Sequence, residues 1–266
     1  KGVSSSSQDE ITLINKGIFT SCKKNDNCPP WSIKAEKITH NKTEKKITYD
    51  NAVLKIYDIP ILYFPKFFHP DPSVKRQSGL LKPTINHSNA LGSSLTVPYF
   101  KRISDDKDFS FRPTWFDNKI LMTQNEFRKT DKNYNLLADF SYVDGYKSSV
   151  TKKKKNLSHL FINFDRNLNL ENFDQSDLIL SIEKVTNDTY LKVFDAHITK
   201  SPARPGNLNN LNNHLKLILN HEKYNFESGV ETYENLQASK NNDRYQHILP
   251  YYNFDTSLGQ KYFDGS

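Results

Sequence analysis

Hydrophobic and polar residues alternate with a period of two along most of this chain, which is the pattern of β-strands with one apolar face. Near the N-terminus, Trp31, Ile33 and Ala35 alternate with polar neighbours. The polar residues 1–10 are expected to form a loop and residues 41–44 a hairpin turn. The pattern predicts a small antiparallel sheet from strands at Ile11–Ile14, Ile18–Ser21, Trp31–His40 and Lys46–Tyr57.

From Gly79 onward, strand-like segments of about ten residues follow one another, separated by tight or long breaks. In one of them, Leu136, Ala138, Phe140 and Tyr142 form an apolar stripe opposite a mostly polar one. Such strands, many ending in Tyr or Phe, favour the wall of an outer-membrane β-barrel, although a half-exposed soluble sheet gives the same alternation. The expected strands are Gly79–Asn86, Ser93–Phe100, Asp108–Phe116, Lys119–Lys129, Tyr134–Tyr142, Ser158–Leu168, Asp177–Lys184, Thr189–Ile198, His214–Glu222 and Phe226–Leu236.

Prolines interrupt the strand-like runs between Thr20 and Tyr99, where they should be scarce because proline cannot donate to a ladder. Pro60, Pro65 and Pro70 predict an extended connector. Pro83 and Pro98 lie in the first two strands of the second region. They mark either strand ends or bulges, or a seam that opens sideways, since each missing hydrogen bond lowers the cost of parting two strands by about 1 kcal/mol.

Composition and charge narrow the class of protein. Hydrophobic residues make up only 36% of the 266 residues, yet aromatic residues reach 12%, which argues against plain disorder. No apolar run approaches the roughly 18 residues of a membrane helix. The formal net charge of +7 fits an anionic partner such as nucleic acid, lipid phosphate or an acidic glycolipid, and a Lys- and Asn-rich composition alone would also produce it.

Candidate catalytic chemistry is sparse. Asp105, Asp106 and Asp108 cluster in what reads as a turn, and the chain has no phosphate-binding glycine loop, zinc-protease motif or nucleophile elbow. The sequence therefore predicts a non-enzymatic protein without a cofactor or metal. The longest polar break carries Lys152, Lys153, Lys154 and Lys155, which form either a solvated loop tip or a contact with anionic lipid phosphates.

The two cysteines, Cys22 and Cys28, have no Cys/His neighbours at zinc spacing. A disulfide is therefore favoured over a metal site, which implies an oxidising compartment such as a periplasm. A bond between them would close a small loop worth roughly 2 kcal/mol. A bond to a distant cysteine and two free thiols are the alternatives.

Both ends of the chain look cut, so an internal piece of a longer protein is expected.

Several motifs follow one another in the order and near the spacing of a known family, over about Cys22–Arg128. The chain resembles the LPS-assembly protein LptD family, also called OstA or Imp. The residues that carry this resemblance are Thr20-Ser21-Cys22, Trp31-Ser32-Ile33, Ile38-Thr39-His40, Tyr49-Asp50-Asn51-Ala52, Ile59-Pro60-Ile61-Leu62-Tyr63-Phe64-Pro65, Lys75-Arg76-Gln77-Ser78-Gly79-Leu80-Leu81-Lys82-Pro83, Val97-Pro98-Tyr99-Phe100 and Asn125-Glu126-Phe127-Arg128.

The resemblance implies a periplasmic β-jelly-roll followed by a large antiparallel barrel in the cell outer membrane. A lipoprotein, LptE, plugs such barrels, and lipopolysaccharide arrives along a bridge built by LptA. Its acyl chains travel through the jelly-roll and leave by a lateral gate between the first and last barrel strands. Pro83 and Pro98 match prolines thought to weaken that gate, and Cys22 matches a cysteine that bonds to a distant one.

The chain also departs from the family pattern. Cys28 is extra, which makes a local bond to Cys22 plausible, and there are too few strands to close the family barrel. The resemblance assigns residues 1–58 to the end of the jelly-roll, 59–78 to a Pro-rich connector and 79–266 to the early barrel strands. It implies lipopolysaccharide, an LptE-like plug, an LptA-like bridge and outer-membrane lipid as partners, and no nucleic acid. A porin or receptor barrel and a soluble β-sandwich that binds an anionic glycan are the competing interpretations.

Overall fold

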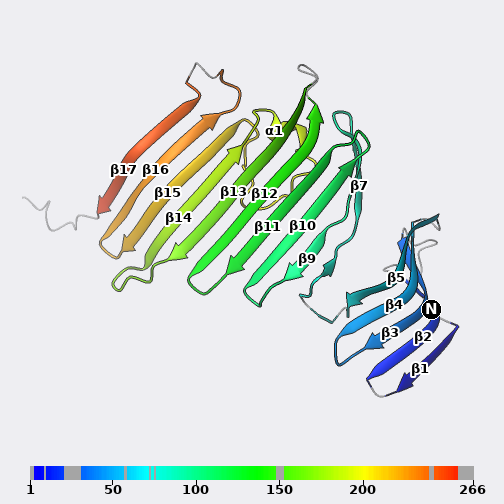
Figure 1. Cartoon of the computed structure of the whole chain (residues 1–266). Coiled ribbons are helices and arrows are strands. Elements are labelled where there is room, and N and C mark those ends of the chain that lie inside the picture. Colours follow the sequence, from blue (N-terminus) through cyan, green and yellow to red (C-terminus); the bar gives the residue numbers. More distant parts are fainter. Residues whose placement is uncertain are drawn as a thin grey trace, which may run out of the picture. The chain divides into compact units, whose positions relative to one another are not determined.

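The computed structural model of the chain describes residues 3–8, 10–20, 31–56, 59–71, 73–74, 76–147, 153–239 and 243–256. The chain divides into two compact units, Lys1–Leu80 and Leu81–Ser266. Antiparallel β-strands make up almost all of the regular structure (Figure 1), so the predicted all-β fold is confirmed. Among the described residues, no helix is both long and apolar enough to cross a membrane.

The first unit contains a five-stranded antiparallel sheet in the order β1-β2-β3-β4-β5. Its strands are β1 (Ser4–Gln8), β2 (Ile11–Phe19), β3 (Trp31–Asn41), β4 (Lys46–Ile56) and β5 (Ile59–Pro70). The sequence predicts a loop for residues 1–10, but residues 4–8 form β1 and pair with β2. A run of serines can form this strand because β1 is an exposed edge strand and buries no apolar face.

Residues 59–70, expected as an extended connector, form strand β5 and pair with β4 between Ile56↔Ile59 and Lys46↔Pro70. The prolines are tolerated because β5 is the edge of its sheet, where an N–H is not needed on the outer side. The first compact unit therefore includes these residues and ends at Leu80, whereas the sequence places the end of the first domain at residue 58.

A crease crosses four strands of the first sheet. The ladders pair Asn15 with Lys37 and Gly17 with Ala35, but skip the residues between them. The neighbouring ladders skip one residue at the same level. The skipped residues are Lys16, Glu36, Asn51 and Pro65.

The register is the same on both sides of the crease, so the skipped residues lie opposite one another, but the side chains of each strand change parity there. Ala35 and Ile38, on either side of the crease in β3, are consequently both buried. The backbone meets this demand with a φ of 51° at both Lys16 and Asn51. One face of the sheet therefore stays apolar along its length and forms a core of Ile33, Ala35, Ile38, Ile47, Tyr49 and Ala52, with Ile14, Phe19, Trp31, Leu54, Phe64 and Phe67 packed against it.

The second sheet has 12 strands, in the order β17-β16-β15-β14-β13-β12-β11-β10-β8-β7, with β6 paired to β9 and β9 to β10. No described pairing joins β17 to β7, so this sheet is open. Its elements are β6 (Gly79–Leu80), β7 (Thr84–Ser88), β8 (Gly92–Thr96), β9 (Tyr99–Arg102), β10 (Lys107–Phe116), β11 (Leu121–Thr130), β12 (Tyr134–Lys147), β13 (Lys154–Asn167), β14 (Gln175–Val185), α1 (Tyr190–Val193), β15 (Asn210–His221), β16 (Tyr224–Asn235) and β17 (Tyr245–Thr256).

The second sheet buries polar side chains on one face and exposes apolar side chains on the other. In β12, the polar residues Asp139 and Ser141 are fully buried, while Phe140 and Tyr142 are 45% and 42% exposed. The predicted alternation of the two stripes is thus confirmed. We call the face that carries Asp139 the inner face and the face that carries Phe140 the outer face.

Residues 186–209, which we call the inner-face segment, connect β14 to β15 and fold over the sheet (Figure 1). The sequence predicts a strand over Thr189–Ile198, but this region contains α1 and turns. Its buried side chains Tyr190, Leu191, Phe194 and Ile198 follow a helical spacing rather than a period of two. They complete a core with Leu91, Phe116, Ile120, Met122, Val143, Leu157, Phe161, Val185, Ala203, Leu211 and Leu236.

Candidate functional site

Prolines break both of the first two strands of the second sheet. Pro83 lies directly before β7, and Pro98 lies directly before β9. The ladder between β7 and β8 accordingly ends at the pair Thr84↔Thr96. The two prolines that the sequence singles out therefore lie at breaks in neighbouring strands.

A third proline, Pro113, lies at the same level in β10. This strand pairs with β8 up to Thr114↔Thr96 and with β9 from Phe111↔Tyr99. The constant register between these pairs sets Pro113 opposite Val97, so the lapse in pairing continues across the third strand. Between Pro113 and β11 the ladder is intact, with Pro113 opposite Thr123. We call Pro83, Pro98 and Pro113 the proline line.

Few backbone hydrogen bonds cross the proline line. The described backbone bonds there are Leu81 N–H to the Pro98 carbonyl, 2.8 Å, and Val97 N–H to the Pro113 carbonyl, 3.2 Å. A proline has no N–H to return, so each of these carbonyls is bonded without reciprocation. An edge with fewer ladder bonds costs less to open, by about 1 kcal/mol for each bond that is missing.

The inner-face segment is tied to the sheet beside the proline line. Nη1 of Arg112 donates to Oγ1 of Thr199 over 2.7 Å. Thr199 in turn donates to Oε1 of Gln124 from its hydroxyl, 3.0 Å, and from its backbone N–H, 3.2 Å. Nε2 of His197 lies 3.1 Å from Oγ of Ser94 in β8. Burial lowers the pKa of His197, which favours its neutral form in this contact.

A buried polar network anchors the same segment through Tyr190. The Tyr190 hydroxyl contacts Oγ of Ser141 and lies 2.9 Å from Nδ1 of His159. Nε2 of His159 is 3.2 Å from Asp139, whose other oxygen accepts from Nε2 of Gln124 over 2.7 Å. Although serine, histidine and aspartate meet here, they are at most 2% exposed. The network therefore holds the segment in place and presents no nucleophile to a substrate.

Other residues singled out by the sequence are not gathered at this site. Lys154 and Lys155 are exposed at the start of β13, opposite Lys147 and Tyr146, and Lys153 precedes them. Lys152, Cys22 and Cys28 lie outside the described residues. Within the described part of the chain, no group of three or more His, Cys, Asp or Glu side chains could hold a metal ion.

Neither the role of Pro113 nor the inner-face segment is predicted from the sequence. Pro113 stands inside the strand-like run Phe111–Phe116, which is the same signal that marks Pro83 and Pro98. Its alignment with them becomes visible only when the strand register is known. The signal for the segment was the helical spacing of its apolar residues.

No protein-family model matches the chain. Among curated proteins, it is 27% identical to the LPS-assembly protein LptD of Idiomarina loihiensis over 188 residues, which are 71% of this chain and 24% of that protein. It is 36% identical to LptD of Shewanella oneidensis over 123 residues, 45% of this chain and 16% of the relative. For LptD of Pseudoalteromonas translucida the values are 33% over 134 residues, 50% and 17%.

The chain thus spans between 16% and 24% of the length of these relatives. The matched relatives share one name, and the antiparallel strands of the structure agree with the fold expected from the motifs. The chain therefore belongs to the LPS-assembly protein LptD family, of which it represents one part.

Proposed function

We propose that this chain takes part in the transport and assembly of lipopolysaccharide at the outer membrane, without enzymatic activity. In this proposal the first unit is the end of a periplasmic β-jelly-roll. The second sheet is part of a β-barrel wall whose first strands border a lateral gate. The observation that carries the proposal is the proline line, because it thins the pairing of neighbouring strands at one edge of the sheet.

The exposure of the outer face supports a membrane wall over a soluble sandwich. Trp115 is 48% exposed and Leu215 is 41% exposed, and both belong to strands whose inner side carries buried groups. A soluble protein would leave a large apolar patch in water, which is rare in monomers. A barrel wall places such a face against lipid and keeps polar groups inside.

The first unit supplies an apolar face suited to acyl chains. Phe64 and Phe67 lie on it with ring centroids 5.4 Å apart, and both are partly buried against its core. In the proposal, an LptA-like bridge delivers lipopolysaccharide to this unit, and an LptE-like lipoprotein occupies the barrel interior. Lys153, Lys154 and Lys155 would contact anionic lipid phosphates, each contributing about 1 kcal/mol.

Alanine at Pro83 and Pro98 in the full-length protein tests the gate. Each substitution restores an N–H to the first strands, which should raise the cost of opening by about 1 kcal/mol. We expect slower arrival of lipopolysaccharide at the cell surface with an unchanged amount of folded protein in the membrane. Pro250→Ala in β17 is the matched control, since it changes a strand proline away from the line. Unchanged delivery in the double variant would refute the gate.

A further inference from the structure

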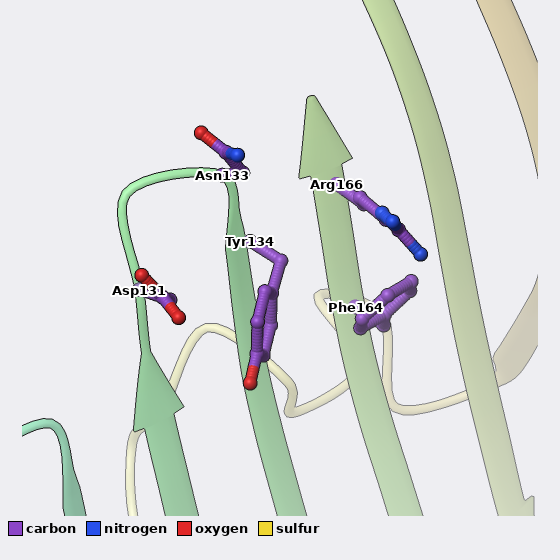
Figure 2. Close-up of a pocket in the computed structure, with 5 residues that line it drawn as sticks. All are labelled: Asp131, Asn133, Tyr134, Phe164 and Arg166. Carbon is purple, nitrogen blue, oxygen red and sulfur yellow. The ribbon is translucent and has the colours of Figure 1, made fainter. Parts of the chain in front are cut away.

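A hollow of about 360 Å³ opens at one end of β11, β12 and β13 (Figure 2). Its lining residues are Asp131, Asn133, Tyr134, Phe164 and Arg166. Asp131 follows β11, Tyr134 begins β12 and Arg166 lies near the end of β13, so Tyr134 stands between the two charged residues (Figure 2). The hollow therefore offers an anionic and a cationic group on opposite sides of an aromatic ring.

This hollow belongs to the outer face of the second sheet. Tyr134 lies opposite Arg166, and Leu136 lies opposite Phe164. Directly opposed residues of antiparallel strands share a face, and alternation along β12 carries this face on to Phe140, which is 45% exposed. An apolar stripe of the outer face thus leads into the hollow.

The floor of the hollow is aromatic and flanked by a second cation. The rings of Tyr134 and Phe164 are tilted, with centroids 6.2 Å apart. Nζ of Lys129 lies 4.7 Å from the centroid of the Tyr134 ring. Tyr134 and Lys129 each combine an apolar body with a polar end. Such amphipathic side chains at the end of an apolar stripe are typical of the boundary between hydrocarbon and water.

The charged groups of the hollow are available for a ligand. The side chain of Arg166 is exposed, and its guanidinium makes no hydrogen bond or ion pair with the residues that the structure describes. Asp131 is exposed as well, and its Oδ1 accepts only the backbone N–H of Lys132, 2.6 Å away. A guanidinium can hold a phosphate through two parallel hydrogen bonds, and the free carboxylate oxygen can accept from an ammonium group.

We propose that this hollow binds the head group of phosphatidylethanolamine, a zwitterionic phospholipid, with its acyl chains along the outer-face stripe. Arg166 and Lys129 hold the phosphate, Asp131 accepts from the ammonium group, and Tyr134 and Phe164 pack against the glycerol. The inference rests on the proposed function, because it requires the second sheet to be a membrane wall.

The charge pattern discriminates among phospholipids. Phosphatidylglycerol has hydroxyl groups but no cation to offer Asp131, so the negative charge of the carboxylate would not be neutralised. Phosphatidylcholine carries a cation without N–H donors, and Asp131 would gain no hydrogen bond from it. Phosphatidylethanolamine offers its phosphate to Arg166 and Lys129 and its ammonium group to Asp131. The short turn at 131–133 also fits the end of a barrel that carries short turns.

The test uses the full-length protein reconstituted in bilayers of equal parts phosphatidylethanolamine, phosphatidylglycerol and phosphatidylcholine, with retained lipids counted by native mass spectrometry. We expect phosphatidylethanolamine to be retained preferentially, and Arg166→Gln to reduce its retention about tenfold, as the loss of a charge-assisted bond predicts. Asp131→Asn should abolish the preference over phosphatidylcholine. Lys132→Gln is the matched control, because it removes a cation from the same turn without touching the hollow.

Equal retention in the Arg166→Gln and Lys132→Gln variants would overturn the site. A preference for phosphatidylglycerol would also overturn it, since unspecific attraction to positive charge would then suffice. Failure of the full-length protein to insert into bilayers would overturn the membrane wall itself. Failure to insert is distinguishable from failure of the lipid site, because lipid retention is counted only on protein that has inserted.

Discussion

Arg112 in β10 and Thr199 in the inner-face segment are joined by a 2.7 Å hydrogen bond. The strand that carries Pro113 is therefore tied to the segment that covers the inner face. Thr199→Val keeps the shape of the side chain and removes its hydroxyl bonds to Arg112 and Gln124. We expect the segment to loosen, with about tenfold faster amide hydrogen exchange around residues 195–201, because local opening costs less.

Hydrogen exchange of the full-length protein, followed by mass spectrometry, measures this effect. Thr189→Val is the matched control, since its hydroxyl bonds only to Asn187 within the segment. If both variants exchange at the same rate over residues 195–201, Thr199 does not hold the segment.

Removal of the Tyr190 hydroxyl should destabilise the second unit. Tyr190→Phe leaves buried polar atoms of Ser141 and His159 without this partner, at a cost of roughly 1–3 kcal/mol. Adding Ser141→Ala removes one of the two groups that lose the Tyr190 hydroxyl, so the double variant should lose less than the sum of the two single variants. Urea unfolding of the full-length protein measures the free energies, and strictly additive losses would contradict a coupled network.

The alternation of the second sheet was predictable from sequence because side-chain direction has a period of two in every strand. Phe140 and Asp139 are an example, since they are neighbours in β12 and their opposite faces follow from the alternation alone. Parity alone does not determine which face is buried, because the polar face is buried by the inner-face segment, which is distant in sequence from β12. The sequence predicts a strand for residues Thr189–Ile198 of this segment, whereas its short helix is stabilised by contacts far apart in sequence, such as Tyr190 with Ser141.

The first sheet shows a different limit of sequence analysis. Its crease shifts parity in four strands at once, so a strict period of two fails at Lys16 and Asn51, where φ is 51°. The prolines of β5 suggested a connector because edge strands tolerate proline as well as loops do. For the candidate site, the sequence identified Pro83 and Pro98, and only the register added Pro113.

Gly17 is required by close packing in the first sheet. A Cβ at this position would collide with Cδ1 of Ile38 and lie 3.0 Å from its Cγ1, and Ile38 is only 6% exposed. Gly17→Ala should therefore destabilise the first unit by about 1–3 kcal/mol, as overpacking does. Adding Ile38→Val removes Cδ1 and should recover part of the loss.

Amide hydrogen exchange of the full-length protein, read by mass spectrometry in peptides from β2, β3 and β4, can follow the unfolding of the first unit selectively. A Gly17→Ala variant as stable as its parent, or no recovery with Ile38→Val, would show that the sheet yields at this contact.

The stability of the first unit should depend on pH through Asp71. The backbone N–H of Ser73 donates to its carboxylate over 2.7 Å, and His40 contacts its other oxygen. These bonds lower the pKa of Asp71 from an ordinary value of 3.8 to about 2, with the contact from Ser73 as the largest cause. Since the pKa is lower in the folded state, the stabilisation is present above pH 4 and is lost as the pH falls towards 2.

Asp71→Asn tests this linkage in the full-length protein, with the stability of the first unit followed by hydrogen exchange in peptides from β2, β3 and β4. The variant should be less stable than its parent at pH 5, because an amide cannot replace the charge-assisted bonds. The difference should shrink as the pH is lowered from 4 to 2, where the parent loses its advantage. Asp50→Asn in β4 is the control and should retain the acid dependence of the parent. A constant difference between Asp71→Asn and its parent from pH 5 to 2 would mean that Asp71 acts through shape rather than charge.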